Sequence, residues 1–231
     1  STQSVVELTM AHLLSSVRHV PKSDRSMRQS KWEKKSLKGT ELRGKSLGLI
    51  GFGRIAQGVG KIAQVIGMTV HTYDPYLPPK IAKLQNTRLH KNVDTLFSSC
   101  THISVHCNLN EETSHLVNLA RMKMMPGESV NGVKCGNHII NCARGGIINE
   151  DDLLTALDEG IIASAALDVF EIEPVSKGNK LVQHPNFHST PHIGAATVEA
   201  QKRVGLDIVR NVMTGLAGKK SEFVVNKQYL K

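Results

Sequence analysis

The chain has 231 residues, of which 40% are hydrophobic and 21% charged, and a formal net charge of +9. No apolar run approaches the roughly 20 residues that a membrane-spanning helix needs, and the first residues lack the basic start and apolar core of a signal peptide. The four cysteines show no CxxC spacing, which favours reduced thiols over disulfides or a metal site. We therefore expect a cytoplasmic globular protein that binds neither a membrane nor a metal.

The positive charge raises the question of nucleic acid, since basic chains often bind it. The basic residues are scattered, apart from one cluster in 25–39, and neither zinc-finger spacing nor aromatic residues interleaved with basic ones accompany that cluster. We prefer a solvated surface that also suits acidic substrates or cofactors, and we expect no nucleic-acid partner.

The chain opens with a predicted helix. Ser4 and Glu7 match the capping-box pattern, and apolar residues then recur at helical spacing as far as Val17. We predict that Pro21 ends this helix and that a polar connector runs to about Arg43. The chain starts without a methionine, so we expect a fragment or a processed piece.

From Lys45 onwards, short apolar runs alternate with helical patterns. The strands are predicted over 46–50, 68–73, 102–106, 138–142 and 161–169, and the helices over 54–67, 149–160 and about 198–214. Continuous apolar strands that alternate with helices indicate a parallel sheet covered on both faces. We therefore predict the α/β class, with a doubly wound parallel sheet of the Rossmann type. The last helix carries an apolar stripe at Val204, Ile208, Val212 and Met213.

The motif GFGRIA, residues 51–56, follows the first strand of the sheet and opens a helix. Gly51 permits a tight turn, and Gly53 lets backbone amides approach a pyrophosphate at the helix N-terminus. Asp74 ends the second strand, where a carboxylate would bind both ribose hydroxyls and repel a 2′-phosphate. The combination predicts NAD binding. A plain strand-to-helix turn, or the glycine loop of a methyltransferase, would show parts of the same pattern.

Other polar residues follow later strands. Arg144 comes after 138–142, Asp168 ends 161–169 with Glu171 and Glu173 just beyond, and His192 precedes a run of small residues. Because ligands of parallel sheets bind beyond the carboxyl ends of the strands, these groups are expected to converge. Taken singly, Arg144 could be a surface arginine, His192 a core histidine and Glu173 an ordinary loop charge.

Four segments in order resemble the nucleotide-binding half of the D-isomer-specific 2-hydroxyacid dehydrogenases. They are GFGRIA with YDP, NCARGGIINE, ALDVFEIEP and HPNFHSTPHIGAATVEAQKRVG, and they span nearly the whole chain. Within the family, the segments WEKKSLKGTELRGKSLGLIGFGRI and NCARGGI most resemble those of the D-3-phosphoglycerate dehydrogenases.

The resemblance implies roles for individual residues. Arg144 would hold the substrate carboxylate, His192 would take the 2-hydroxyl proton, and Glu173 would pair with His192, with Glu171 as a competing partner. Gly145 and Gly146 would leave room for substrate and nicotinamide. The cofactor would further contact a set of residues along the strand ends: Gly51, Gly53, Arg54, Ile55, Asp74, Cys107, Cys142, Ala143, Arg144, Asp168, His192 and Gly194.

The chain also departs from the family pattern. Cys107 and Asn108 replace the usual threonine-proline pair, and the excursion over 127–138 is longer than usual, as a surface loop or, less favoured, a partner site. We expect residues 1–20 to form an inter-domain helix, 21–215 the NAD-binding domain, and 216–231 a return segment towards an absent substrate domain. This piece alone is then expected to bind NAD but turn over poorly.

The resemblance predicts oxidation of a D-2-hydroxy acid, most specifically 3-phospho-D-glycerate to 3-phosphohydroxypyruvate in serine biosynthesis, by a homodimer. Arg18 and the basic connector could help to attract the phosphorylated acid. Two alternatives stay open: a glyoxylate or hydroxypyruvate reductase with the same residues, and a corepressor-type module that binds NAD(H). Formate dehydrogenases share the fold but replace the glutamate that pairs with the histidine, so Glu173 argues against that chemistry.

Overall fold

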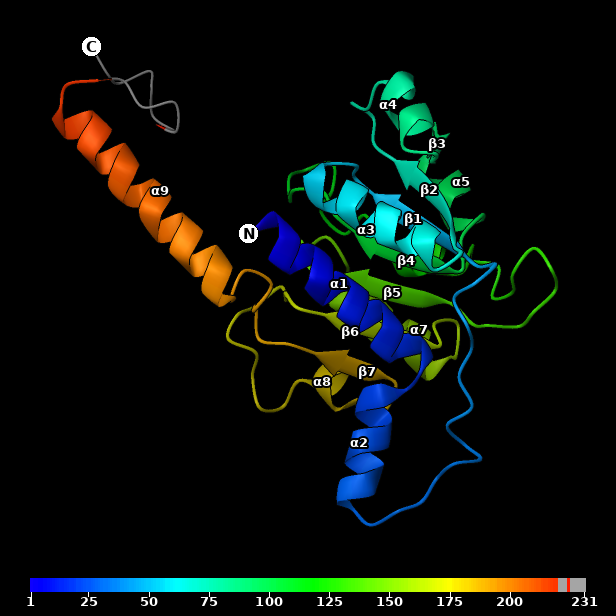
Figure 1. Cartoon of the computed structure of the whole chain (residues 1–231). Helices are drawn as coiled ribbons and strands as arrows, with labels where there is room; N and C mark the ends of the chain where they lie inside the picture. Colours follow the sequence, from blue (N-terminus) through cyan, green and yellow to red (C-terminus); the bar gives the residue numbers. More distant parts are fainter. Residues whose placement is uncertain (220–223, 225–231) are drawn as a thin grey trace.

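A seven-stranded parallel sheet forms the centre of the molecule (Figure 1), and the computed structural model describes residues 1–219 and 224. The strand order is β3-β2-β1-β4-β5-β6-β7, and every neighbouring pair is parallel. The strands are β1 (Ser46–Ile50), β2 (Thr69–Tyr73), β3 (Arg88–His90), β4 (His102–Val105), β5 (His138–Asn141), β6 (Ser164–Leu167) and β7 (Phe187–Ser189). From β1 to β3 the chain adds strands towards one side of the sheet, and from β4 to β7 it adds them towards the other. This arrangement confirms the predicted doubly wound fold.

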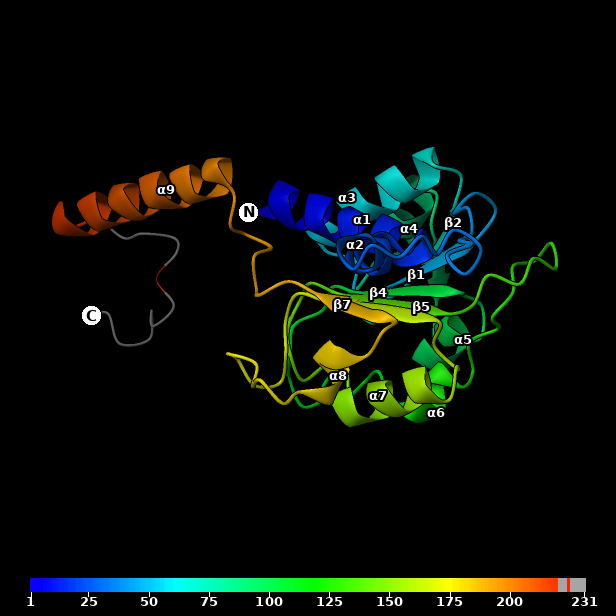
Figure 2. The ribbon, with the colours of Figure 1, turned by 90° about the horizontal axis from the view of Figure 1, so that it is seen from below.

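Helices cover both faces of the sheet. Figure 2 shows α1 and α3 on one side and α5, α6, α7 and α8 on the other. The helices are α1 (Thr2–Val17), α2 (Val20–Arg28), α3 (Arg54–Val65), α4 (Pro79–Leu84), α5 (Val93–Phe97), α6 (Leu119–Met122), α7 (Glu150–Asp158), α8 (Lys180–Gln183) and α9 (Val198–Leu216). No helix in the described part of the chain is both long and apolar enough to cross a membrane.

The two-sided cover explains why the strands read as continuous apolar runs. Leu47 and Leu49 of β1 are fully buried in a core shared with α1 and α3, whereas Ile103 of β4 and Ile139 of β5 are fully buried in a second core on the other face. Each strand thus buries alternate side chains against different helices.

The start of α1 differs from the prediction. The helix begins at Thr2 with Ser1 as the N-cap residue, so Ser4 lies inside it and the predicted capping box is wrong. Ser4 is buried, and its hydroxyl lies 2.8 Å from the hydroxyl of Thr197. Glu7 accepts a hydrogen bond from Gln3 rather than reaching back to an N-cap. The serine joins α1 to a distant loop, a role that local spacing cannot reveal.

Pro21 starts a helix rather than opening a connector. It occupies the first turn of α2, where its missing N–H costs nothing, and His19 at φ 53° joins α2 to α1. The predicted polar connector is therefore wrong over α2, and irregular chain begins only after Arg28.

Helix α9 extends away from the sheet (Figure 1). It begins at Val198, as predicted, and its N-cap is Thr197, whose hydroxyl accepts from the Ala200 amide. The apolar stripe, however, is exposed, from 47% at Val204 to 65% at Met213. No element in residues 1–219 covers it. Of the predicted return segment 216–231, residues 220–223 and 225–231 lie outside the described part.

The excursion before β5 is a surface loop at the amino edge of the sheet. It is held by an antiparallel bridge between Glu128 and Lys134, and Val130 near its tip is 88% exposed. The sequence did not predict α4, α5, α6, α8, β3 or β7, because elements of three to six residues are too short to show a clear period.

Candidate active site

The glycine turn lies at the carboxyl edge of the sheet, between β1 and α3. Gly51 has φ +86°, and a Cβ there would come within 3.0 Å of the backbone of His106 and Cys107. Gly53 is the N-cap of α3, and a Cβ there would meet nothing within 4 Å. No side chain caps the helix. The free amides of its first turn, with Arg54 and Ile55, therefore border open space that suits a phosphate.

Asp74 follows β2 next to this turn. One of its carboxylate oxygens accepts from the Phe52 amide at 2.9 Å, and the other accepts from the Tyr76 amide at 3.0 Å. Asp74 therefore fixes the glycine turn as well as facing the space beside it. The Asp74 carboxylate therefore lies next to the glycine turn, at the position where the sequence predicted a ribose-binding acid.

A cavity of about 390 Å³ joins the glycine turn to the ends of β2 and β4. Its size is within the range of small-molecule sites. Gly51, Gly53, Asp74 and Cys107 all line it. Burial, together with the nearby Asp74 charge, raises the pKa of Cys107 to about 11, against a weaker lowering by its own backbone hydrogen bond, so the cavity wall there is a neutral thiol. An open glycine, a bare helix N-terminus and an acid around one cavity fit an adenine dinucleotide.

Arg144 is positioned by the turn after β5. Asn141 is buried and holds both ends of this turn, since its amide donates to the Arg144 carbonyl at 2.9 Å and its oxygen accepts from the Ala143 amide at 2.9 Å. The Arg144 side chain is exposed, and its guanidinium donates to the Ala143 carbonyl at 2.6 Å.

The two glycines after Arg144 have a different role from the one predicted. A Cβ on Gly145 would stand only 1.8 Å from the Phe170 carbonyl oxygen, so Gly145 is required for close packing of two backbones. Gly146 has φ +80°, which favours glycine by itself. The contacts thus explain both glycines by main-chain geometry, not by room for a substrate.

His192 and Glu173 form a hydrogen-bonded pair. His192 Nδ1 lies 2.7 Å from one carboxylate oxygen of Glu173, and the other oxygen accepts from the Phe170 amide at 2.9 Å. Burial alone would raise the pKa of Glu173, but the hydrogen bonds from His192 and Phe170 and the charges of His192 and Arg144 outweigh it and lower that pKa. Glu171 instead lies 3.1 Å from His115, so it is not the partner of His192.

Asp168, at the end of β6, anchors the loop that carries His192. It is 1% exposed, and its carboxylate accepts from the amides of Ile193 and Gly194, both at 2.8 Å, and from the Thr190 hydroxyl at 2.5 Å. His192 has φ 54°, a left-handed conformation that is rare outside glycine. Its amide donates to the Asp168 carbonyl at 2.9 Å.

Two predicted positions need a correction or a restriction. Arg18 ends α1 at the amino edge of the sheet, beside Gly39, whereas Val5 near the start of α1 packs on Gly194. At 1.5 Å per residue, Arg18 lies about 20 Å along the helix from the predicted site, so it does not line that site, and its role in attracting substrate stays a prediction. The Cys142 side chain is buried in the core under α1 and so would face a cofactor only through its main chain.

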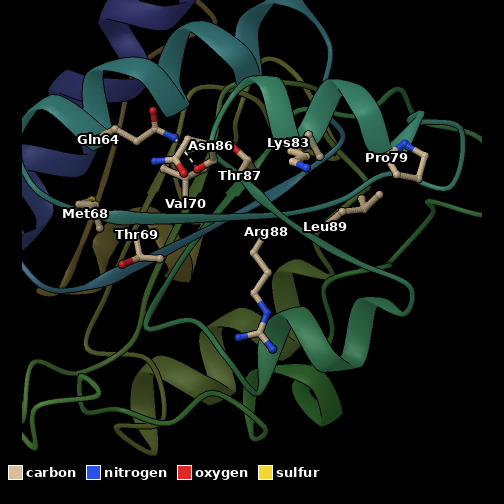
Figure 3. A pocket seen from close by; sticks show the side chains of 11 residues that line it. Gln64, Met68, Thr69, Val70, Pro79, Lys83, Asn86, Thr87, Arg88 and Leu89 are labelled. Atoms are coloured by element: carbon tan, nitrogen blue, oxygen red, sulfur yellow. Dashed lines mark hydrogen bonds between the residues drawn. The ribbon is translucent and has the colours of Figure 1, made fainter.

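Two further cavities were not predicted. One of about 630 Å³ is lined by His192 and Glu173 themselves, together with Phe170, Val175 and Pro191. The other, of about 540 Å³, lies at the start of β2 and against α4, whereas the glycine turn and Asp74 lie at the opposite, carboxyl edge of the sheet. Figure 3 shows the side chains that line it. There Gln64 donates to the carbonyls of Gln85 and Asn86, and Arg88 points away from that group. No cluster of three or more metal-ligating side chains occurs among the described residues.

Comparison with known proteins gives a consistent result. Residues 10–194 match the family described as "D-isomer specific 2-hydroxyacid dehydrogenase, NAD binding domain". Over 226 residues the chain is 40% identical to a D-3-phosphoglycerate dehydrogenase of Methanocaldococcus jannaschii, covering 98% of this chain and 41% of the relative. It is 42% identical over 218 residues to a hydroxypyruvate reductase of Thermotoga maritima, covering 94% of this chain and 67% of the relative.

The fold is similar to solved structures as well. A protein of Thermus thermophilus superposes with a TM-score of 0.85 at 31% identity, over 96% of this chain and 67% of that one. The chain thus spans about two-fifths of the length of the Methanocaldococcus relative and two-thirds of the Thermus structure.

Proposed function

The chain belongs to the D-isomer specific 2-hydroxyacid dehydrogenases through its NAD-binding domain, and on that premise we propose that the protein carrying it oxidises a D-2-hydroxy acid with NAD. The observation that carries the proposal is the bond of 2.7 Å between His192 and Glu173 at the same sheet edge as the glycine turn and Asp74. His192 and Glu173 line the cavity of about 630 Å³, whereas the glycine turn and Asp74 line the separate cavity of about 390 Å³, which would take the adenosine end of NAD.

The residues divide the chemistry between them. Bound NAD would supply the hydride acceptor. Since Nδ1 of His192 faces Glu173, the free Nε2 is the atom that would accept the 2-hydroxyl proton, or return it during reduction. Glu173 orients the ring and stabilises the imidazolium form. Arg144, with an exposed planar guanidinium, would bind the substrate carboxylate through two parallel hydrogen bonds.

The cofactor would lie along the strand ends. Gly51, Gly53 and the first turn of α3 would hold the pyrophosphate, and Asp74 the adenosine ribose. Because Asp74 carries a negative charge next to the glycine turn, we expect NAD to bind more tightly than NADP. Asp168 would lie on the nicotinamide side, as would Ala143 and Gly194.

We propose 3-phospho-D-glycerate as the substrate, because the Methanocaldococcus and Bacillus subtilis relatives, at 40% and 41% identity, are named D-3-phosphoglycerate dehydrogenases. Reaction at C2 would give 3-phosphohydroxypyruvate, a precursor of serine. The second candidate is hydroxypyruvate reduction, because the Thermotoga relative with that name is 42% identical.

Steady-state kinetics on the full-length protein separate the two candidates. The substrates would be 3-phosphoglycerate, glycerate, hydroxypyruvate and glyoxylate, with NAD+ or NADH as required. We expect the highest kcat/KM for oxidation with 3-phosphoglycerate. A higher kcat/KM for glycerate than for its phosphate ester would favour the hydroxypyruvate reductase, and no turnover of any 2-hydroxy or 2-oxo acid would contradict the proposed function altogether. We also propose a homodimer, which light scattering would test; a monomer at high concentration would contradict it.

A further inference from the structure

Helix α1 runs alongside the loop that carries His192 and contacts it at three places. The Ser4 hydroxyl lies 2.8 Å from that of Thr197. A Cβ on Gly194 would meet Val5 at 3.4 Å, so the helix packs directly on the loop backbone. Farther along α1, His12 Nε2 lies 3.0 Å from the Thr190 hydroxyl. The loop is therefore held between α1 on one side and Asp168 on the other.

The contact at Thr190 links both sides. Its hydroxyl has one proton, and the Asp168 carboxylate, 2.5 Å away, can only accept when ionised. The proton therefore goes to Asp168, and the Thr190 oxygen must accept from His12. This fixes the proton of His12 on Nε2 and makes a directed chain from His12 through Thr190 to Asp168.

The surroundings of His12 favour this neutral donor. The side chain is 4% exposed, and its ring lies 5.1 Å from the ring of His188, centroid to centroid. Burial lowers the pKa of His12, although the Asp168 charge opposes that shift. Near neutral pH the ring thus stays uncharged and can hold its Nε2 proton towards Thr190.

The hydrogen-bond chain from His12 ends at Asp168, which holds the strained backbone of His192. Asp168 accepts from the amides of Ile193 and Gly194 through its carboxylate and from the His192 amide through its main chain. These bonds hold His192 at φ 54°, a conformation that costs free energy in a non-glycine residue and persists only when neighbours enforce it. If the Asp168 side chain could move, the His192 ring would also move and lose its fixed position against Glu173.

We infer that His12 and Thr190 are positioning residues, which fix Asp168 so that the turn at His192 keeps its imidazole against Glu173. The inference rests on the proposed function for its kinetic consequences only, because the geometry of the turn can be followed without turnover. His12 lies in α1 and 180 residues before His192, and no motif in the sequence pairs the two.

The test uses the full-length protein with four variants. Thr190→Val removes the hydroxyl and keeps the shape of the side chain, and Thr190→Ser retains the hydroxyl. His12→Leu removes the hydrogen-bond donor and puts an apolar side chain in the same buried position. Ser16→Ala is the matched control, since Ser16 lies on the same buried face of α1 and its hydroxyl has no hydrogen-bond partner among the described residues. Hydrogen–deuterium exchange is followed in peptides covering 190–197 and, as an internal reference, α7.

We expect Thr190→Val to raise exchange at 192–194 about tenfold, as loss of a hydrogen bond to a charged group would, with α7 unchanged. His12→Leu should give a smaller rise, and Thr190→Ser and Ser16→Ala none. In kinetics, Thr190→Val should lower kcat about tenfold while KM changes less than twofold, and Thr190→Ser should restore kcat.

Unchanged exchange at 192–194 in Thr190→Val would overturn the inference, and so would a rise that extends equally to α7. A serine variant that behaves like valine would also overturn it, because the hydroxyl would then not be the group that matters. If the unmodified protein turns over no 2-hydroxy acid, the proposed function fails, yet the exchange pattern still decides this inference.

Discussion

His192 and Arg144 face the same edge of the sheet, but the chain holds them in different ways. His192 is fixed by Glu173 at its ring and by Asp168 at its amide. Arg144 has a well-fixed backbone, through Asn141, yet its guanidinium makes one hydrogen bond, to the adjacent Ala143 carbonyl. The proposed acid–base group is thus held in place before a substrate binds, whereas the guanidinium of Arg144 keeps most of its donors unused. We therefore expect a bound substrate to fix the side chain of Arg144 while leaving that of His192 where it is.

The largest effect is expected at the pre-organised side. His192→Asn should lower kcat about a thousandfold, since general acid–base catalysis contributes ~10²–10⁴, with NADH affinity little changed. Steady-state rates and calorimetric titration with NADH measure the two quantities. A variant that retains a tenth of the activity would show that another group moves the proton.

On the arginine side, Arg144→Gln should lower kcat/KM about a hundredfold, because charge-assisted hydrogen bonds to the substrate carboxylate are lost. Arg144→Lys should recover only part of it, since an ammonium cannot form the two-pronged contact. A large fall in melting temperature in either variant would contradict this role, because Arg144 would then support the fold.

Glu173→Gln tests the partner of His192 and its pH dependence. It should lower kcat about tenfold by removing a charge-assisted bond. The pKa of Glu173 is lowered below the ordinary value of 4.5, so its carboxylate contributes stability above that value and loses it as the pH falls through the lowered pKa. The difference in melting temperature between the two proteins should therefore be largest near pH 7 and shrink as the pH falls below 4.5, and a difference that does not shrink in acid would contradict this role of Glu173.

An effect of about the same size is expected at the cofactor cavity, on cofactor binding rather than on kcat. Asp74→Ala should weaken NAD+ binding about tenfold, by removing hydrogen bonds to the ribose, and should reduce the preference over NADP+. Asp74→Asn is the control, because an amide oxygen can still accept from the Phe52 amide that Asp74 now binds. Calorimetric titration would contradict the role of Asp74 if NADP+ bound the unmodified protein as tightly as NAD+.

The sequence predicted those parts of the fold that depend on interactions between residues close together in the chain. Five of the seven strands (β1, β2, β4, β5 and β6) and helices α3 and α7 were predicted within a few residues, because apolar runs and cap residues such as Asn149 act locally. The turn at Gly51 was predicted for the same reason. Pro21 shows the limit, since a proline both ends helices and begins them.

What the sequence could not show are contacts between distant segments. Ser4 looked like a cap but binds Thr197, and Gly145 looked like space for a ligand but packs on the Phe170 carbonyl. The choice between Glu171 and Glu173 also needed coordinates, because both follow Asp168 and only one meets His192. Thr190 carried one weak signal, its place two residues before His192, and His12 carried none.

In the proposed reaction, Arg144, His192 and Glu173 act together on one substrate at the carboxyl edge of the sheet. The most direct test is a crystal structure of the full-length protein with NADH and oxamate, a mimic of a 2-oxo acid. We predict the oxamate carboxylate on the Arg144 guanidinium and its carbonyl oxygen within hydrogen-bonding distance of His192 Nε2, with the Glu173 bond intact. Oxamate bound away from both side chains, or NADH bound away from Gly53 and Asp74, would contradict it.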